Sequence, residues 1–227
     1  MAGVHDGHRA RRKAQFREHG LDVFTDHGAL ELLLFYAVPQ RDVNPLAHRL
    51  LERFGSLEAV FSATPEELEG IEGVGEHAAT LLTLIFPLVR RVHMQSLRGG
   101  VALCDAAQLG RYFCGVFFGV QQEMFYEACL DAKGKLLRCC KVANGSVDAV
   151  QINIRCIVEN ALRYHASAVV LSHNHPSGVA IPSPDDNATT LMAYDALRTV
   201  GIELLDHIIV ADGDFVSLRD NGLLPPR

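Results

Sequence analysis

The chain has 227 residues, of which 48% are hydrophobic, so it can form two domains of about 100 residues with cores of their own. Its formal net charge of −6 lacks the basic excess of proteins that depend on nucleic-acid affinity. No apolar run reaches the roughly 18 residues that a membrane helix needs. The first residues lack the apolar segment of a secretory signal, and the six cysteines form no CxxC pair. We therefore expect a cytoplasmic protein with free, mostly buried thiols and no membrane association.

A basic cluster opens the chain, and it has two interpretations. It is either a solvated terminal segment or a short arm that lies along phosphates. The cluster consists of Arg9, Arg11, Arg12, Lys13 and Arg17.

The following region, to about residue 92, has apolar residues at helical spacing. Pro45 suits the first turn of one helix, and Gly55 suits the end of that helix. Thr64 and Glu67 form a capping box, which predicts the start of another helix. Residues 1–98 are thus predicted to form a small all-α domain, and Gly99-Gly100 to be a linker. The apolar positions are Leu30, Leu33, Leu34, Leu46, Leu50, Leu51, Leu57, Val60, Phe61, Ala78, Leu81, Leu82 and Ile85.

Residues 101–227 alternate between strand and helix patterns, which predicts an α/β domain with a mixed sheet. The continuous apolar run at 168–172 is typical of a strand that is buried on both faces. The expected elements are a hairpin at 123–131 and 135–142, a helix at 152–164, a strand at 168–172, a helix at 183–199 and a hairpin at 208–217.

The residues that could bind a metal or take part in catalysis lie in the segment that joins the predicted buried strand to the next helix. His173 and His175 are two residues apart in an extended chain, so both imidazoles face the same side. Ser183 is placed to cap the next helix, with Asp186 in its first turn. An isolated His-x-His is usually not a metal site, and the capping box alone explains Asp186. Together, however, two imidazoles and a carboxylate are a common ligand set for catalytic zinc.

The pattern His173-x-His175-x7-Ser183-x2-Asp186 resembles the JAMM (MPN-type) metalloprotease motif. The run His-Asn-His-Pro-Ser-Gly that begins at His173 is similar to the signature of the RadC family. The similarity covers roughly residues 13–224, including Leu205-Asp-His-Ile-Ile-Val. It implies a JAMM-like mixed β-sheet with flanking helices, preceded by a small helix-hairpin-helix domain.

The resemblance also implies a catalytic mechanism. Glu123 would be the general base for a zinc-activated water, with Glu127 as the alternative on the same strand face. Ser183 would donate a hydrogen bond that stabilises the oxyanion. These roles imply a zinc metallopeptidase or isopeptidase that acts on a peptide or isopeptide substrate.

The sequence departs from the family pattern before the helix at 152–164. Relatives typically have Gly-Thr-Leu and then Val-His-Pro-Arg-Glu, whereas this chain has Gly-Ser-Val-Asp from Gly145. Arg155 is kept, but Asn153, Ile154 and Cys156 replace the other polar groups. If those groups shape the substrate channel, the specificity of this chain differs.

The all-α region contains Gly73 and Gly75, which resemble the hairpin of a helix-hairpin-helix module. Such glycines let backbone N–H groups approach a DNA phosphate. Glu69, Glu72 and Glu76 surround the hairpin and would repel phosphate, so protein docking or a vestigial role is the other interpretation. The alternative function is thus a DNA-associated repair or recombination accessory protein whose zinc is structural or inactive.

Overall fold

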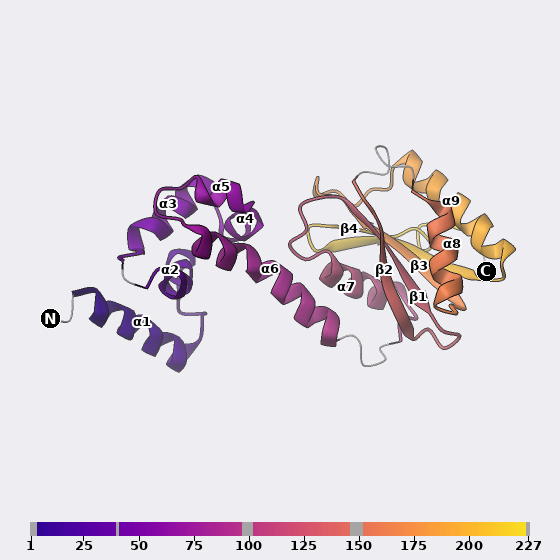
Figure 1. Cartoon of the computed structure of the whole chain (residues 1–227). Helices are drawn as coiled ribbons and strands as arrows, with labels where there is room; N and C mark the ends of the chain where they lie inside the picture. Colours follow the sequence, from indigo (N-terminus) through magenta and orange to yellow (C-terminus); the bar gives the residue numbers. More distant parts are fainter. Residues whose placement is uncertain (1–3, 40, 97–101, 146–151, 226–227) are drawn as a thin grey trace. The chain divides into compact units, whose positions relative to one another are not determined.

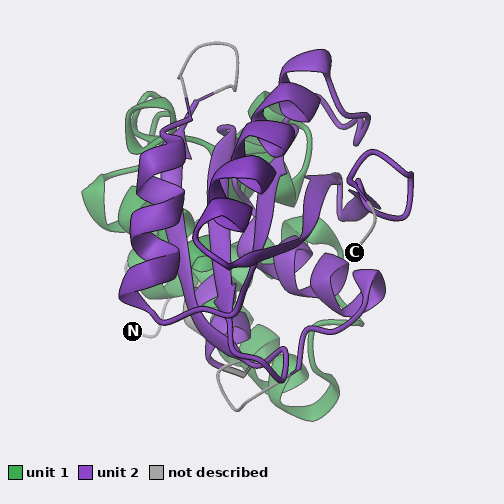
Figure 2. Cartoon of the chain, turned by 90° about the vertical axis from the view of Figure 1, so that its right-hand side faces the viewer, with its two compact units in different colours: residues 1–89 green, residues 90–227 purple. Residues whose placement is uncertain are grey.

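The structure is a computed structural model that describes residues 4–39, 41–96, 102–145 and 152–225. The chain divides into two compact units, residues 1–89 and 90–227 (Figures 1 and 2). We call them the helical unit and the sheet unit. The proposed linker at Gly99-Gly100 and most of the divergent segment after Gly145 lie outside the described residues.

The helical unit is all-α, as the apolar spacing predicts, although its first helix has 16 residues and its last has 21. Gly55 ends one helix with a φ of 87°, and Ser56 caps the next through its side chain. Thr64 and Glu67 form the predicted capping box. The helices are α1 (Val4–His19), α2 (Asp26–Ala37), α3 (Asn44–Phe54), α4 (Leu57–Ser62), α5 (Pro65–Glu69) and α6 (Glu76–Ser96), the last of which continues past residue 89.

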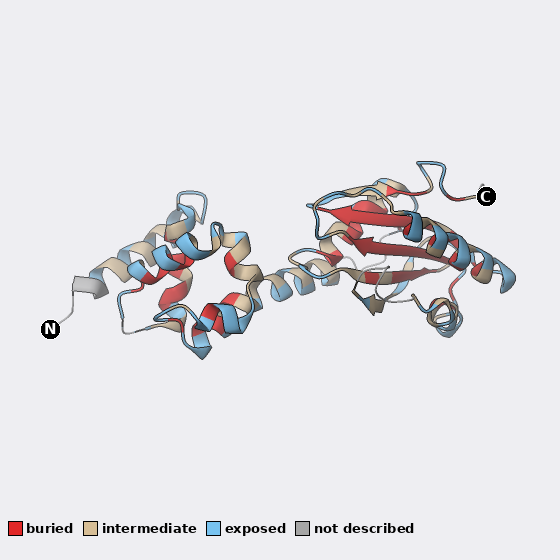
Figure 3. Cartoon of the chain, turned by 90° about the horizontal axis from the view of Figure 1, so that it is seen from above, coloured by how far each residue is buried: buried red, intermediate tan, exposed pale blue. Residues whose placement is uncertain are grey.

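The buried faces of these helices form one apolar core, which includes Leu30, Leu34, Leu50 and Leu82. Figure 3 shows the buried stripes turned inward and the exposed faces outward. Helix–helix packing of this kind explains why helices of only five or six residues persist here, since such short segments are unstable alone.

The basic N-terminal segment forms helix α1. Arg9 donates hydrogen bonds to the carbonyls of Phe35 and Val38 at the end of α2 and to that of Arg41 in the segment that follows. The last carbonyls of a helix have no partner within it, and a cation near them also suits the helix dipole. Arg9 thus stabilises the contact between α1 and α2.

A buried carboxylate strengthens the same contact. Glu31 on α2 is fully buried, and its Oε1 lies 3.1 Å from His8 Nε2. The other oxygen lies 3.5 Å from Arg12 Nε. Asn44 donates to Oε1 at 3.2 Å. A buried charge needs such partners, so Arg12 has a structural role here as well.

The sheet unit contains the predicted mixed sheet, with strand order β2-β1-β3-β4-β5. Only β3 and β4 pair in parallel, and the other pairs are antiparallel. Both predicted hairpins and the fully buried strand are present. The strands are β1 (Met124–Leu130), β2 (Leu136–Asn144), β3 (Ala168–Asn174), β4 (Glu203–Ala211) and β5 (Asp214–Ser217).

Helices cover both faces of this sheet (Figure 1). Helices α8 (Ile154–Arg163) and α9 (Pro184–Thr199) pack over Phe125 and Leu171 on one face. On the other face lies α7 (Ala106–Val116), an element that the sequence analysis did not predict. Strand β3 lies in the middle of the sheet between these layers, which is why all seven of its residues are buried.

All six cysteines are free, as expected, but only Cys129 is buried, whereas Cys104 is exposed and the others are intermediate. The expectation of mostly buried thiols is therefore wrong. The difference follows from β2, an edge strand, which carries Cys139 and Cys140 and is covered less completely than β3. Across the described residues, no helix combines the length and apolarity required to cross a bilayer.

Candidate metal centre

The two histidines lie where β3 leaves the sheet. His173 is the penultimate residue of β3, and its side chain faces α9 together with Leu171. The backbone N–H of His175 still bonds to Val210 of β4, so the chain remains extended as far as His175. Both imidazoles therefore point to the same side, and their Nε2 atoms are 2.9 Å apart.

The carboxylate arrives from the first turn of α9. Ser183 and Asp186 form a capping box in which each side chain bonds to the backbone N–H of the other residue. Both the N–H and the hydroxyl of Ser183 donate to Asp186 Oδ2, at 2.8 and 2.7 Å. The helix cap thus fixes Oδ2, and Oδ1 is left to face His173.

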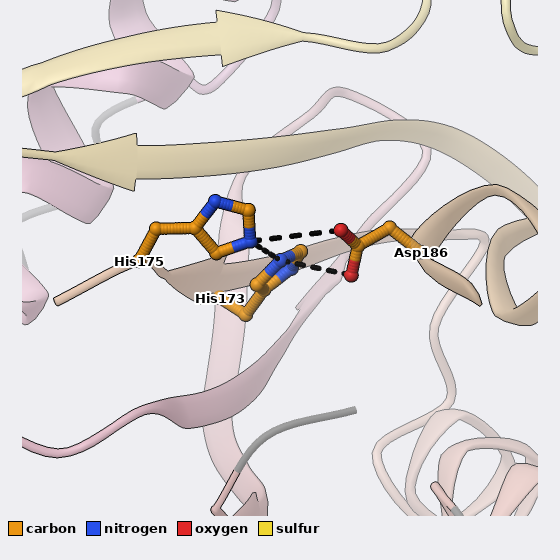
Figure 4. Close-up of side chains that lie close together, drawn as sticks. All are labelled: His173, His175 and Asp186. Atoms are coloured by element: carbon orange, nitrogen blue, oxygen red, sulfur yellow. Dashed lines mark hydrogen bonds and ion pairs between the residues drawn. The ribbon is translucent and has the colours of Figure 1, made fainter. Parts of the chain in front are cut away.

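Figure 4 shows how the three side chains converge. His173 Nε2 lies 3.0 Å from Asp186 Oδ1, and His175 Nε2 lies 3.5 Å from Oδ2. Four ligands at about 2.0–2.1 Å around zinc would be about 3.3 Å from one another in tetrahedral geometry. His173, His175 and Asp186 therefore form a group that could hold a metal ion.

Burial makes this cluster costly without a cation. The side chain of His173 is 0% exposed, that of Asp186 is 1% exposed, and that of His175 is 15% exposed. Apart from the contact with His173 Nε2, no N–H or O–H group of the described residues makes a hydrogen bond to Asp186 Oδ1. A buried carboxylate oxygen without a donor loses its hydration, and a metal ion in contact with it would restore the lost interaction.

The charges of the site shift its pKa values. Burial alone would raise the pKa of Asp186, but the neighbouring imidazoles of His173 and His175 outweigh it and hold this pKa well below its usual range. The hydrogen bond to Asp186 raises the pKa of His175, against the effect of burial, and the negative charge of Glu123 also contributes. Asp186 is therefore ionised at neutral pH, as a metal ligand must be.

Glu123 directly precedes β1, beside the histidines. Phe125 pairs with His173 across the two strands, and strand alternation gives Glu123 the same face as Phe125. The amide of Asn174 accepts from Met124 N at 2.9 Å and donates to Gln122 O at 3.1 Å. Asn174 therefore holds the backbone on both sides of Glu123, a positioning role that the sequence analysis missed.

Glu127, the alternative base, lies deeper in the sheet unit. It is fully buried, accepts from Asn160 at 3.0 Å and lies 3.6 Å from the Cys129 thiol. Burial raises its pKa from 4.5 to about 7, against the opposing effects of the hydrogen bonds from Asn160 and Cys129. Glu127 pairs with Leu171, whereas Glu123 precedes the end of β1 that pairs with His173, so Glu123 remains the better candidate for the base.

The residues that depart from the family pattern are found at the start of α8. Asn153 caps this helix by accepting from Cys156 N at 3.3 Å. Cys156 also accepts from Asn160, and the exposed Arg155 pairs with Glu159 at 2.6 Å. These replacements thus support the helix itself. Their effect on substrate choice stays a prediction.

The glycines of the predicted hairpin lie between α5 and α6. Gly73 has a φ of 98°, so it needs to be glycine for its backbone alone. Gly75 has no such constraint, and an added Cβ would meet nothing within 4 Å. A cavity of about 280 Å³ lies beside it, lined by Arg41, His77 and other residues. DNA contact at this hairpin stays a prediction.

Comparison with known proteins defines the class first. Residues 103–223 match the family described as "RadC-like JAB domain", a range that includes Glu123 and the three converging side chains. The sheet unit is thus a JAB-type domain with a candidate metal site.

Full-length similarity then defines the family. The UPF0758 protein of Vibrio cholerae (strain ATCC 39315) is 36% identical over 205 residues, which cover 90% of this chain and 92% of the relative. UPF0758 protein BPP1850 of Bordetella parapertussis is 37% identical over 207 residues, with coverage of 91% and 92%. The UPF0758 protein of Vibrio atlanticus is 33% identical over 203 residues, covering 89% and 91%. The chain therefore belongs to the RadC family.

Proposed function

We propose that this protein is a zinc-dependent hydrolase that cleaves peptide or isopeptide bonds. The observation that carries the proposal is the convergence of His173, His175 and Asp186 at 2.9–3.5 Å, where the buried oxygen Oδ1 has no partner among the described residues besides His173. Free cysteines suit the cytoplasm, where we expect the protein to act.

A catalytic role for the metal fits better than a structural one. Structural zinc sites are closed by four protein ligands, whereas catalytic sites use three and keep one position for water or substrate. Among the described residues, only three side chains of metal-binding type converge here. A zinc ion at this position would lower the pKa of a bound water and polarise the carbonyl oxygen of the substrate.

The chain's own carboxylate would handle the proton. The hydrogen bond to Asp186 is the main cause of the raised pKa of His175, and the charge of Glu123 also contributes, which supports a position of this carboxylate near the site. It would accept a proton from the attacking water and later deliver it to the leaving amine. Asn174 would keep Glu123 in place through the two backbone bonds at its sides.

Ser183 would contribute to oxyanion stabilisation only by changing its hydrogen bond. Its hydroxyl has one proton, which it donates to Asp186 Oδ2. To donate to a substrate oxyanion, that proton would have to turn away from Asp186, while the N–H of Ser183 continued to bond to the carboxylate. We propose this exchange as the role of Ser183.

The test combines metal analysis with a substrate screen. We expect one zinc per chain and hydrolysis of at least one member of a broad panel of peptides and isopeptides. Glu123→Gln should keep the zinc and lower the rate by about 10²- to 10⁴-fold, because it removes the base and not a ligand. Glu58→Gln, an exposed change in the helical unit, is the control and should leave the rate unchanged.

Two results would contradict the proposal. One is purified protein that takes up no zinc. The other is a Glu123→Gln variant that hydrolyses the same substrate at the wild-type rate.

A further inference from the structure

A third histidine lies against the candidate site without being one of its three ligands. His207 on β4 is fully buried, and its Nε2 lies 2.9 Å from His173 Nδ1. The parallel pairing of β3 with β4 brings the two rings together, since His207 is the register partner of Leu171 and His173 that of Ile209. The sequence analysis gave His207 no role.

A buried threonine determines which nitrogen of His207 carries a proton. Thr190 Oγ1 on α9 lies 2.5 Å from the backbone carbonyl of Asp186 and 2.5 Å from His207 Nδ1. A hydroxyl has one proton, and a carbonyl can only accept. The hydroxyl therefore donates to Asp186 O, and His207 Nδ1 must be the donor toward Thr190.

The same reasoning reaches the metal ligand. Complete burial favours the neutral form of His207, so with Nδ1 protonated its Nε2 is an acceptor. His173 Nδ1 must then donate to it. This leaves the lone pair of His173 Nε2 free toward His175 and Asp186, as a metal ligand requires.

Without the hydrogen bonds that join His173 to His207 and Thr190, the nearest acceptor would favour the Nε2–H tautomer of His173, which cannot bind a metal through Nε2. Asp186 Oδ1 lies 3.0 Å from His173 Nε2, and a carboxylate would attract a proton to that nitrogen. His175 is fixed more simply, because its Nδ1 lies 2.9 Å from the carbonyl of Val179, which can only accept. Each of the two ligating histidines thus has an acceptor for an Nδ1 proton, so that its neutral ring presents the Nε2 lone pair to the site.

We propose that Thr190 and His207 are positioning residues that hold His173 in its Nδ1–H tautomer, so that the site is ready for a metal before one binds. The inference rests on the metal site of the proposed function, but not on hydrolysis. It extends the site from three residues to five and joins α9, β3 and β4 through one directed hydrogen-bond chain.

The first test is zinc affinity, measured by competition with a chromophoric chelator at constant pH. Thr190→Val keeps the shape but removes the hydroxyl, and it should weaken zinc binding by about 10- to 100-fold, the range for partners of ligating histidines. Thr190→Ser, the matched control, keeps the hydroxyl and should stay close to wild type. His207→Leu should lose affinity, and His207→Gln should recover part of it by offering an amide oxygen to His173.

The second test reads the tautomer directly in the metal-free protein. Long-range ¹⁵N–¹H NMR spectra of the histidine rings, recorded near pH 8 and thus above the ordinary histidine pKa of about 6.5, distinguish Nδ1–H from Nε2–H. We expect Nδ1–H for His173 in wild type and Thr190→Ser, and a shift toward Nε2–H in Thr190→Val. Backbone amide spectra of the same samples show whether each variant folds.

The inference is overturned if His173 carries its proton on Nε2 in the wild-type protein. It is also overturned if folded Thr190→Val and Thr190→Ser bind zinc equally well. Zinc binding and tautomers as expected, in a protein that hydrolyses nothing, would support this inference and count against the proposed function alone.

Discussion

The two units use their polar residues in opposite ways. In the helical unit, Arg9 bonds to the carbonyls at the end of α2, and the buried Glu31 has His8, Arg12 and Asn44 beside it. In the sheet unit, three side chains converge on one point, and Asp186 Oδ1 has no partner besides His173 in the part of the chain that the structure describes.

The difference separates two kinds of motif residue. When the fold itself satisfies a residue, as it does the basic residue Arg9, its presence in the sequence is explained without a ligand. When a buried carboxylate converges with two imidazoles, as Asp186 does with His173 and His175, a bound cation is the simplest explanation. Among the described residues, such a convergence of metal-binding side chains is found in the sheet unit, which therefore gives the stronger functional signal.

The largest expected effect is the loss of zinc from a variant of the sheet unit, with no loss from a variant of the helical unit. His175→Ala removes one of three ligands and should reduce zinc from about one per chain to almost none, measured by metal analysis after gel filtration. His77→Ala removes an exposed histidine from the helical unit and should retain the metal. Full zinc occupancy in a His173→Ala, His175→Ala double variant would refute the site.

A smaller effect concerns the buried Glu127. Its folded-state pKa of about 7 exceeds its ordinary value of 4.5, so the folded protein binds this proton more tightly than the unfolded chain does. Its contribution to stability is therefore complete below about pH 4.5 and is lost as the pH rises to about 7. Glu127→Gln should remove this loss and raise the free energy of unfolding at pH 8 by about 1–3 kcal/mol.

Urea unfolding at pH 5 and pH 8 measures this difference. Glu58→Gln, an exposed change in the helical unit, is the control and should leave the pH dependence unchanged. If Glu127→Gln is less stable than wild type at pH 8, folding does not raise the pKa of Glu127 as expected.

The smallest effect would come from the helical unit. If its hairpin contacts DNA phosphates, binding should be no tighter than about micromolar at physiological salt and should weaken steeply as salt rises. Gly75→Ala fits the backbone and the available space, so it should weaken binding several-fold without unfolding the unit or releasing zinc.

Fluorescence anisotropy with labelled duplex and branched DNA across a salt series tests this expectation. Equal binding by wild type and Gly75→Ala would remove the hairpin as the contact. Tight, salt-independent binding would mean that a different surface recognises DNA. Either result would mean that the hairpin at Gly73 and Gly75 is not the DNA contact of the helical unit.

Local patterns predicted most of the fold. The capping boxes at Thr64 and Ser183, the turn at Gly55 and the buried run of β3 each depend on residues close together in the chain, and each is present. Helix α7 was not predicted, although Asp105 caps it, because its apolar residues resemble the strand patterns that follow. Its helical state is supported by packing against β4 and β5.

The sequence predicted the three candidate metal ligands but not His207 and Thr190, which contact them. His173, His175 and Asp186 lie within one short segment, so spacing and a helix cap were enough to bring them together. His207 and Thr190 reach His173 only through the pairing of β3 with β4 and the packing of α9. Such contacts between distant segments have no signature in the sequence of either segment.

The two oxygens of Asp186 have different partners, since Oδ2 accepts from Ser183 and Oδ1 faces His173, and this difference has a thermodynamic consequence. Because Oδ2 belongs to the helix cap, the rotamer of this side chain is set when α9 forms. The entropy lost in ordering it is then a cost of folding and not of metal capture, so the site is preorganised. The linkage also runs in reverse, because a bound ion would stabilise the first turn of α9. Amide hydrogen exchange in that turn should therefore slow when zinc is added.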